Sequence, residues 1–243
     1  MMKKLPYITY LLLVCLLLNN SLFAQETSQS SYYNWFDNLI GVENTGLFDG
    51  IQYKEQYRTI NEKHKFYNSP RFLKGNLIYD EQPYYNIDMK YDLYEDVVLI
   101  RLDNPDGGDV ILQLIKSKIK EFTINGNRFI NLDYNTTITE VSLGFHEVLF
   151  QKNEIVFYKK NKKSKKDRLD QKILYSEFND DSNYKLFYNN EFYDIKSKRN
   201  LIKIFPDLKK EINAFHDKNR SLLDSNPDAY MLQLMKSIQN NLP

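Results

Sequence analysis

The clearest pattern in the chain is an alternation of apolar and polar residues between positions 85 and 93. The apolar or aromatic positions are Tyr85, Ile87, Met89, Tyr91 and Leu93. Successive side chains of a strand point to opposite faces, so the segment is predicted to be a strand with one buried and one solvated face. Asp88 and Asp92 belong to the face that is predicted to be solvated.

Similar short strands recur along residues 46–195, and residues that favour turns separate them. Asn125-Gly126, Lys152-Asn153 and Asn189-Asn190 each lie between apolar segments, as the turns of β-hairpins do. Short strands at regular spacing are typical of antiparallel sandwiches and barrels. The chain is therefore predicted to be mainly β, with an antiparallel β-sandwich or an open barrel as its main body.

The apolar period changes from strand-like to helical after Ser197. Leu208, Ile212 and Phe215 recur at helical spacing, and a second stripe follows Asn226 and Pro227, which suit the N-cap and the first helical position. The second stripe contains Tyr230, Met231, Leu234, Met235 and Ile238. We expect a C-terminal helical pair that docks its apolar faces on the sheet, with a partner-binding helix as the alternative.

The first 24 residues have the layout of a secretory signal peptide. Lys3 and Lys4 give a basic start, an apolar run ends at Leu18, and Ala24 is a small residue before a polar segment. The apolar run is shorter than the roughly 20 residues that a bilayer-spanning helix needs. The sequence thus predicts cleavage after Ala24, export to the periplasm or cell surface, and a mature chain that does not span the membrane. An uncleaved anchor is the alternative.

Cleavage would leave a β domain at residues 25–196 and a helical segment at residues 197–243 that packs on it. The only cysteine is Cys15, inside the predicted signal, so the mature core would need no disulfide. Lipid attachment at Cys15 is disfavoured by the branched Val14 before it. The aromatic cluster at residues 32–36 is predicted to be a short helix or strand that packs on the body, with sugar stacking as the alternative.

The charge balance disfavours one class of partner. The formal net charge is +1, and loss of Lys3 and Lys4 with the signal changes it to −1. A nearly neutral chain has no overall electrostatic attraction for nucleic acid, so we expect no nucleic-acid partner.

No motif commits the sequence to a catalytic residue, a metal or a cofactor. His64, His146 and His216 have neither the i, i+4 spacing nor the His-Glu-x-x-His pattern of helical zinc sites. Residues 103–109 carry acids at their first, fourth and seventh positions, which does not match an EF-hand loop. We therefore expect a polar hairpin loop at residues 103–109.

The sharpest local feature is a basic run that lies between two predicted strands. Its cations are Lys159, Lys160, Lys162, Lys163, Lys165, Lys166 and Arg168. The run is predicted to be a long exposed hairpin loop, which is either simply solvated or an anion-binding finger. Such a finger would bind lipid headgroup phosphates, an acidic glycan or an envelope protein, since each basic residue gains about 1 kcal/mol near an anionic surface.

Several segments resemble a pattern that is common in exported proteins of Bacteroidota. They have a glycine, alternating apolar residues, a tyrosine, a turn and a strand that ends in Lys-Tyr-Asp. The segments are residues 75–79, 84–86, 90–94, 193–195 and 197–198, together with the Phe23-Ala24-Gln25 junction. The resemblance implies an envelope location and a β-rich fold, and it carries no active site.

Two hypotheses for function follow. The first is a non-catalytic exported protein of the cell envelope, a binding or structural module of unknown ligand. The second is an exported hydrolase that uses Asp88 and Asp92, because two carboxylates that flank a sugar can hydrolyse a glycosidic bond.

Overall fold

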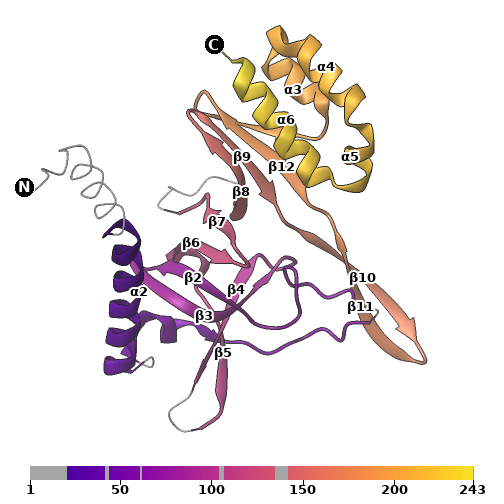
Figure 1. Ribbon diagram of the computed structural model, residues 1–243. Coiled ribbons are helices and arrows are strands. Elements are labelled where there is room, and N and C mark those ends of the chain that lie inside the picture. The colour runs from indigo at the N-terminus through magenta and orange to yellow at the C-terminus, as the bar shows by residue number, and fades with distance from the viewer. Residues whose placement is uncertain (1–20, 42–43, 61, 104–106, 135–141, 243) are drawn as a thin grey trace, which may run out of the picture.

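The described residues form one antiparallel sheet of eleven strands, and a two-stranded ribbon extends from it (Figure 1). The computed structural model describes residues 21–41, 44–60, 62–103, 107–134 and 142–242, so the predicted signal core and part of the loop at 103–109 lie outside the described residues. The strand order in the large sheet is β1-β5-β4-β3-β2-β6-β7-β8-β9-β12-β13. The strands of this sheet are β1 Ile51–Gln52, β2 Leu73–Tyr79, β3 Gln82–Asp92, β4 Val97–Asp103, β5 Asp109–Gln113, β6 Ile119–Ile124, β7 Asn127–Asn131, β8 Phe145–Lys152, β9 Ile155–Lys160, β12 Asn183–Tyr188 and β13 Glu191–Ile195.

Helices lie at the two ends of the chain. They are α2 Ser21–Ile40, α3 Lys198–Ile204, α4 Lys209–Lys218, α5 Arg220–Ser225 and α6 Pro227–Asn241, with short 3-10 turns η2 Gly46–Asp49, η3 Lys116–Lys118 and η4 Pro206–Leu208. The predicted aromatic element is the helix α2, which begins at Ser21, before the predicted cleavage position. Among the described residues, no helix combines the length and apolarity needed to cross a membrane.

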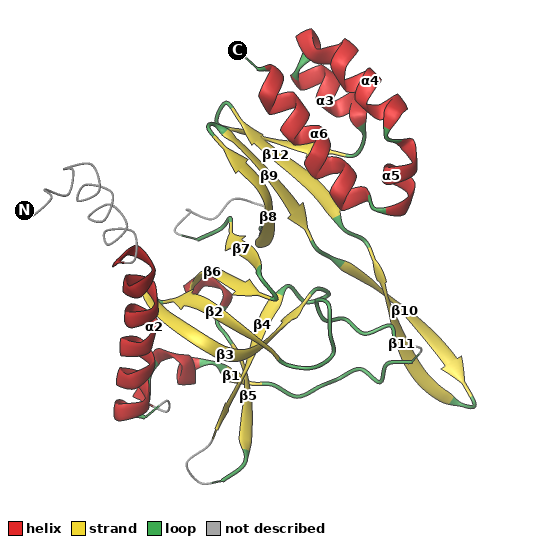
Figure 2. Cartoon of the chain, in the orientation of Figure 1, coloured by secondary structure: helices red, strands yellow, loops and turns green. Residues whose placement is uncertain are grey.

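The predicted fold class is confirmed. The chain is mainly β, its large sheet is antiparallel and open, and helices follow the sheet at the C-terminus (Figure 2). The two predicted C-terminal helices correspond to α4 and α6, and the shorter α3 and α5 accompany them. The Asn226 side chain accepts a hydrogen bond from the backbone N–H of Ala229, 3.0 Å away, so the predicted N-cap is present.

A β-bulge changes which tyrosine of β3 enters the core. Gly75 pairs with Ile87 and Leu77 pairs with Tyr84, so Tyr85 and Asn86 together lie opposite one residue of β2. Asn86 has a positive φ of 58°. The extra residue reverses the alternation. Tyr84 is therefore buried and Tyr85 is only half-buried, contrary to the predicted apolar face, whereas Met89, Tyr91 and Leu93 are buried as predicted.

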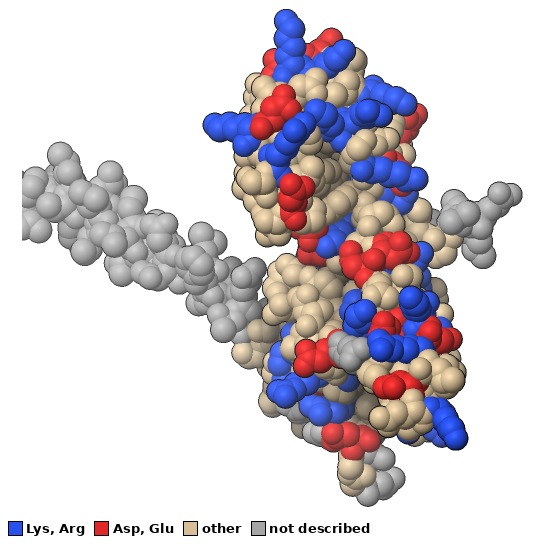
Figure 3. Space-filling model, turned by 90° about the vertical axis from the view of Figure 1, so that its right-hand side faces the viewer, with Lys and Arg blue, Asp and Glu red and all other residues tan. Residues whose placement is uncertain are grey.

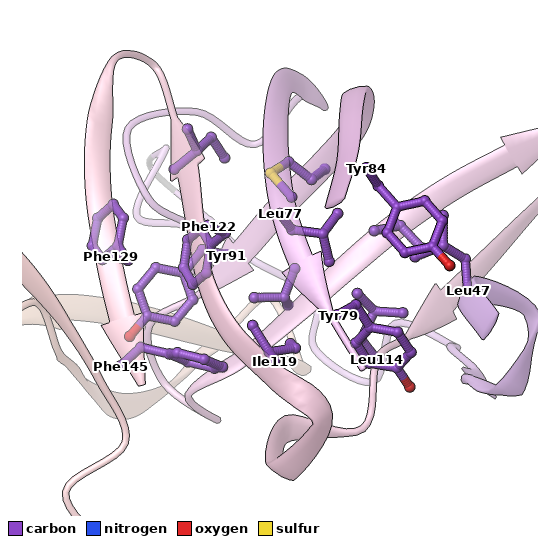
Figure 4. Packing of buried hydrophobic residues seen from close by; sticks show 14 of the residues in the cluster. Leu47, Leu77, Tyr79, Tyr84, Tyr91, Leu114, Ile119, Phe122, Phe129 and Phe145 are labelled. Carbon is purple, nitrogen blue, oxygen red and sulfur yellow. The ribbon is translucent and has the colours of Figure 1, made fainter. Parts of the chain in front are cut away.

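The N-terminal part of the sheet encloses an aromatic core, which we call the ring core (Figure 4). Phe122 and Phe129 are stacked with their centroids 4.8 Å apart, and Tyr91 meets Phe122 edge-to-face at 5.3 Å. Phe145 closes the group at 5.2 Å from Phe122. Offset and edge-to-face ring pairs add about 0.5–1.5 kcal/mol each beyond the area they bury, so these contacts specify one arrangement of the strands.

The C-terminal strands and helices enclose a second core, which we call the helix core. Its sheet side chains come from β9, β12 and β13, and its helical side chains come mainly from α6. The predicted stripe of Tyr230, Met231, Leu234, Met235 and Ile238 is buried. The helices therefore pack on this end of the sheet and not on its whole face (Figure 2).

Candidate functional site

The predicted loop at the basic run is wrong, because most of these residues form strands. Lys159 and Lys160 end β9, Lys162 lies in the short connection, and Lys163, Lys165, Lys166 and Arg168 belong to β10 Lys163–Asp170. β10 pairs with β11 Ile173–Asp180 in a two-stranded ribbon that extends away from the body (Figure 1). Gln171 and Lys172 form its turn, with positive φ angles of 46° and 66°. β10 has no alternation of apolar and polar residues, so the sequence pattern does not reveal it. It is a strand because it pairs with β11.

The cations nearest the body are held by protein groups. Lys159 pairs with Asp228 at 2.6 Å, and Lys160 pairs with Asp96 at 2.8 Å. Lys163 donates to the backbone carbonyl of His64. These residues anchor the ribbon and the end of β9, so they do not form a free anion-binding surface.

The other cations of the run, Lys162 before the ribbon and those further along β10, are more exposed. Lys162 pairs with Asp181, Lys165 with Asp167 and Arg168 with Glu177, each at 3.2 Å. The Lys162–Asp181 pair is exposed, and such pairs contribute about 0–1 kcal/mol, whereas the Glu177 carboxylate is buried. Lys166 and Lys172 are exposed, and no carboxylate of the described residues lies within ion-pair distance of either. The anion-binding prediction is therefore limited to the outer half of the run.

The base of the ribbon is supported by residues 53–60 and 62–64, which run beside β11. Ser176 donates its backbone N–H to the carbonyl of Arg58 at 2.8 Å, and Phe178 donates its backbone N–H to the carbonyl of Lys63 at 3.0 Å. The Phe178 ring also packs edge-to-face against Tyr57, with centroids 5.5 Å apart. The ribbon is thus fixed at its base, and only its tip extends beyond this support.

The tip of the ribbon carries apolar side chains that are not covered. Leu169 is 71% exposed, Leu174 is 62% exposed and Ile173 is 38% exposed. Leu169 and Leu174 lie directly opposite each other in the register. The sequence analysis missed this patch because it treated the basic run and the following strand separately. The apolar residues on either side of Gln171-Lys172 could have revealed it.

Asp88 and Asp92, the carboxylates of the hydrolase hypothesis, have different ion-pair partners and different degrees of burial. Asp88 lies 2.8 Å from Arg101 and 3.1 Å from Lys74, and the hydrogen bond from Arg101 lowers the pKa of Asp88. The prediction that Asp92 is solvated is wrong. Asp92 is fully buried and pairs with Lys65 at 2.8 Å. Burial opposes the charge on Lys65, but hydrogen bonds to Asp92 and Tyr53 outweigh it and raise the Lys65 pKa.

A second, partly buried charge cluster lies where the ring core meets β9; we call it the seam. Asp96 accepts a hydrogen bond from the Tyr91 hydroxyl at 2.6 Å and pairs with both Lys116 and Lys160. Gly144 lies against this cluster with a positive φ of 69°, and a Cβ there would lie 2.0 Å from Asp96 Oδ2. A glycine is therefore required where the ring core meets β9.

The three histidines lie apart and have structural surroundings. His146 is buried near the seam, and burial, with a smaller contribution from Lys160, lowers its pKa to about 4. His216 lies 3.0 Å from the Tyr230 hydroxyl. The His64 ring accepts from the Phe66 N–H at 3.2 Å. Across the described ranges, no group of three or more His, Cys, Asp or Glu is placed to bind a metal ion.

Two surface hollows are open, and Asp88 lines neither of them. One of 450 Å³ lies between the β12–β13 turn and α3, lined by Phe192, Tyr193 and Lys203 among others. Another of 360 Å³ lies beside residues 51–57 and Lys65. On the face seen in Figure 3, basic and acidic side chains are interspersed, so neither sign dominates it.

Comparisons of the chain with protein-family models, with curated proteins and with solved structures gave no match.

Proposed function

We propose that this chain is an exported, non-catalytic protein of the cell envelope that binds a partner through the outer half of the β10–β11 ribbon. The observation that carries the proposal is the exposed tip, where Leu169 and Leu174 extend beyond the hydrogen bonds to Arg58 and Lys63. Exposed apolar side chains that cluster on a projecting element are typical of interaction sites. The basic start, apolar run and Ala24 support export.

The arrangement of the ionisable groups supports a binding role over a hydrolytic one. A glycosidase needs one carboxyl group with a raised pKa and a second carboxylate across the scissile bond. Asp88 instead has a lowered pKa beside Arg101, and Asp92 is buried beneath Lys65. Both carboxylates serve the packing of β3 against its neighbours.

Export is tested by the mass and location of the mature protein. The full chain is expressed with its first 24 residues, the cells are fractionated, and the purified product is weighed by mass spectrometry. We expect a product that begins at Gln25, in the envelope or the medium. A full-length product confined to the cytoplasm would contradict the proposal.

The binding role is tested by cross-linking within intact cells. A photoreactive amino acid replaces Lys166 on the ribbon, and the matched control replaces Lys209, which is exposed on α4. We expect cross-links to lipid, glycan or protein from position 166 and few from position 209. Equal labelling from both positions would remove the ribbon as the site, and turnover of a glycan or ester library that Asp88→Asn abolishes would favour the hydrolase instead.

A further inference from the structure

We infer that the tip of the β10–β11 ribbon docks on a lipid surface that contains anionic headgroups. The inference rests on the proposed function and names the partner of the same site. Two properties of the tip carry it: aliphatic side chains exposed on both faces of the ribbon, and a surplus of cations around them.

The aliphatic side chains lie on opposite faces of the ribbon. Residues directly opposite each other in an antiparallel pair share a face, so Leu169 and Leu174 form one apolar pair. Ile173 is adjacent to Leu174 and therefore points to the other face. A groove in a folded protein covers one face of a strand pair, whereas a lipid surface surrounds the tip and contacts both faces. The arrangement thus favours lipid over a protein groove.

The charges around these side chains complement an anionic surface. Between residues 165 and 175 there are four cations and two carboxylates. Asp167 is paired with Lys165, and Arg168 is paired with Glu177. Lys166 and Lys172 therefore remain for headgroup phosphates, each worth about 1 kcal/mol near an anionic leaflet. Asp170 lies beside the turn, so the tip enters only to headgroup depth.

The ribbon is already organised for this contact. Its two-residue turn has positive φ at both positions, which suits the twist of a tight hairpin. Its base is fixed by Lys163 and by the hydrogen bonds to the carbonyls of Arg58 and Lys63. Docking therefore requires no refolding, and little conformational entropy is lost on binding.

Co-sedimentation with vesicles tests the inference on the mature chain. The vesicles are phosphatidylcholine alone and phosphatidylcholine mixed with phosphatidylglycerol. We expect binding to the mixed vesicles that weakens as salt increases. Leu169→Asn with Leu174→Asn should weaken binding roughly four- to twelvefold per leucine, because each loses about half of the transfer free energy of a fully buried side chain. Leu39→Asn, at an exposed leucine of α2, is the matched control and should leave binding unchanged.

The contribution of the cations is tested separately. Lys166→Ser with Lys172→Ser should weaken binding about fivefold per residue at low salt. Lys209→Ser with Lys210→Ser, two exposed lysines of α4, is the control for charge alone. Thermal unfolding by circular dichroism shows that each variant is folded before its binding is compared.

A fluorescent reporter measures insertion directly. Leu174→Trp in a Trp35→Phe background places the only tryptophan of the chain at the tip. We expect its emission to shift to shorter wavelength with mixed vesicles. No shift, unchanged binding of the leucine variant, or equal loss in the Leu39→Asn control would each overturn the lipid inference. Cross-links from position 166 to an envelope protein, without vesicle binding, would overturn it while leaving the proposed function intact.

Discussion

The two cores of the molecule cover the same continuous sheet in different ways. In the ring core the buried side chains come from strands, their connections and the short turn η2, and fixed contacts among Tyr91, Phe122, Phe129 and Phe145 fill the centre. In the helix core the sheet residues are covered by aliphatic and methionine side chains of α6, such as Leu234 and Met235. Rings need specific relative orientations, whereas methionine adapts to irregular gaps. The ring core should therefore tolerate substitution less well.

The strongest test of this difference is Phe122→Ala. Phe122 is 1% exposed and contacts three other rings, so its removal leaves a cavity that they cannot readily fill. We expect the free energy of unfolding to fall by about 3–5 kcal/mol, measured by urea denaturation and circular dichroism. A loss below about 1 kcal/mol would show that the ring core repacks freely and that the contrast is wrong.

The junction of the ring core with β9 is tested at the seam by Asp96→Asn. The substitution leaves Lys116 and Lys160 without their shared carboxylate. Because breaking a buried ion pair costs about 3–5 kcal/mol and this one is partly exposed, we expect a loss of about 3 kcal/mol. Lys162→Ser, which breaks the exposed pair with Asp181, is the control and should change stability by less than about 0.5 kcal/mol. Equal effects would mean that the seam contributes no more than a surface pair.

His146, which is buried near the seam, should make the protein sensitive to mild acid. Its pKa is about 4 in the folded chain and 6.5 in the ordinary state, so the unfolded chain binds the proton more tightly. Stability is therefore fully present above pH 6.5 and is lost as the pH falls toward 4, by about 3 kcal/mol in total.

Thermal unfolding across this pH range measures the effect. His146→Gln should remove this part of the dependence, whereas His216→Gln should retain it. If the His146→Gln variant shows the same acid sensitivity as the parent chain, another group is responsible.

The smallest expected change in stability is in the helix core, and it tests whether that core tolerates substitution better than the ring core. Met235 is fully buried on α6, and Met235→Leu conserves its volume. We expect a change below about 1.5 kcal/mol, with unchanged helix content by circular dichroism. A change as large as that of Phe122→Ala would show that the helix core is packed as specifically as the ring core.

Much of the fold could be predicted because its signals are local. Turn residues such as Asn125-Gly126 and Asn189-Asn190, together with the α6 stripe, determine structure within a few neighbouring positions. The failures have non-local causes. The bulge depends on Asn76, which accepts a hydrogen bond from the N–H of Asn86 across the strand pair. Asp92 is buried because Lys65, distant in sequence, neutralises it.

The candidate site was predicted only in part, for the same reason. The basic run is visible in the sequence, but its pairing with β11 and with carboxylates such as Asp96 and Asp228 is not. Most of its charge is used within the molecule. The apolar tip became evident only when the register placed Leu169 opposite Leu174.

The order of the two cores along the chain has a consequence for folding kinetics. The ring core draws its residues from Leu47 to Phe145, and the helix core draws its residues from Leu149 to Leu242. Most neighbouring strands are also consecutive in sequence, and such local pairings form faster than distant ones. On the proposed route of export, a chain that emerges with its N-terminus first can therefore complete the ring core before the helices emerge. The helix core then forms on an edge that is already folded.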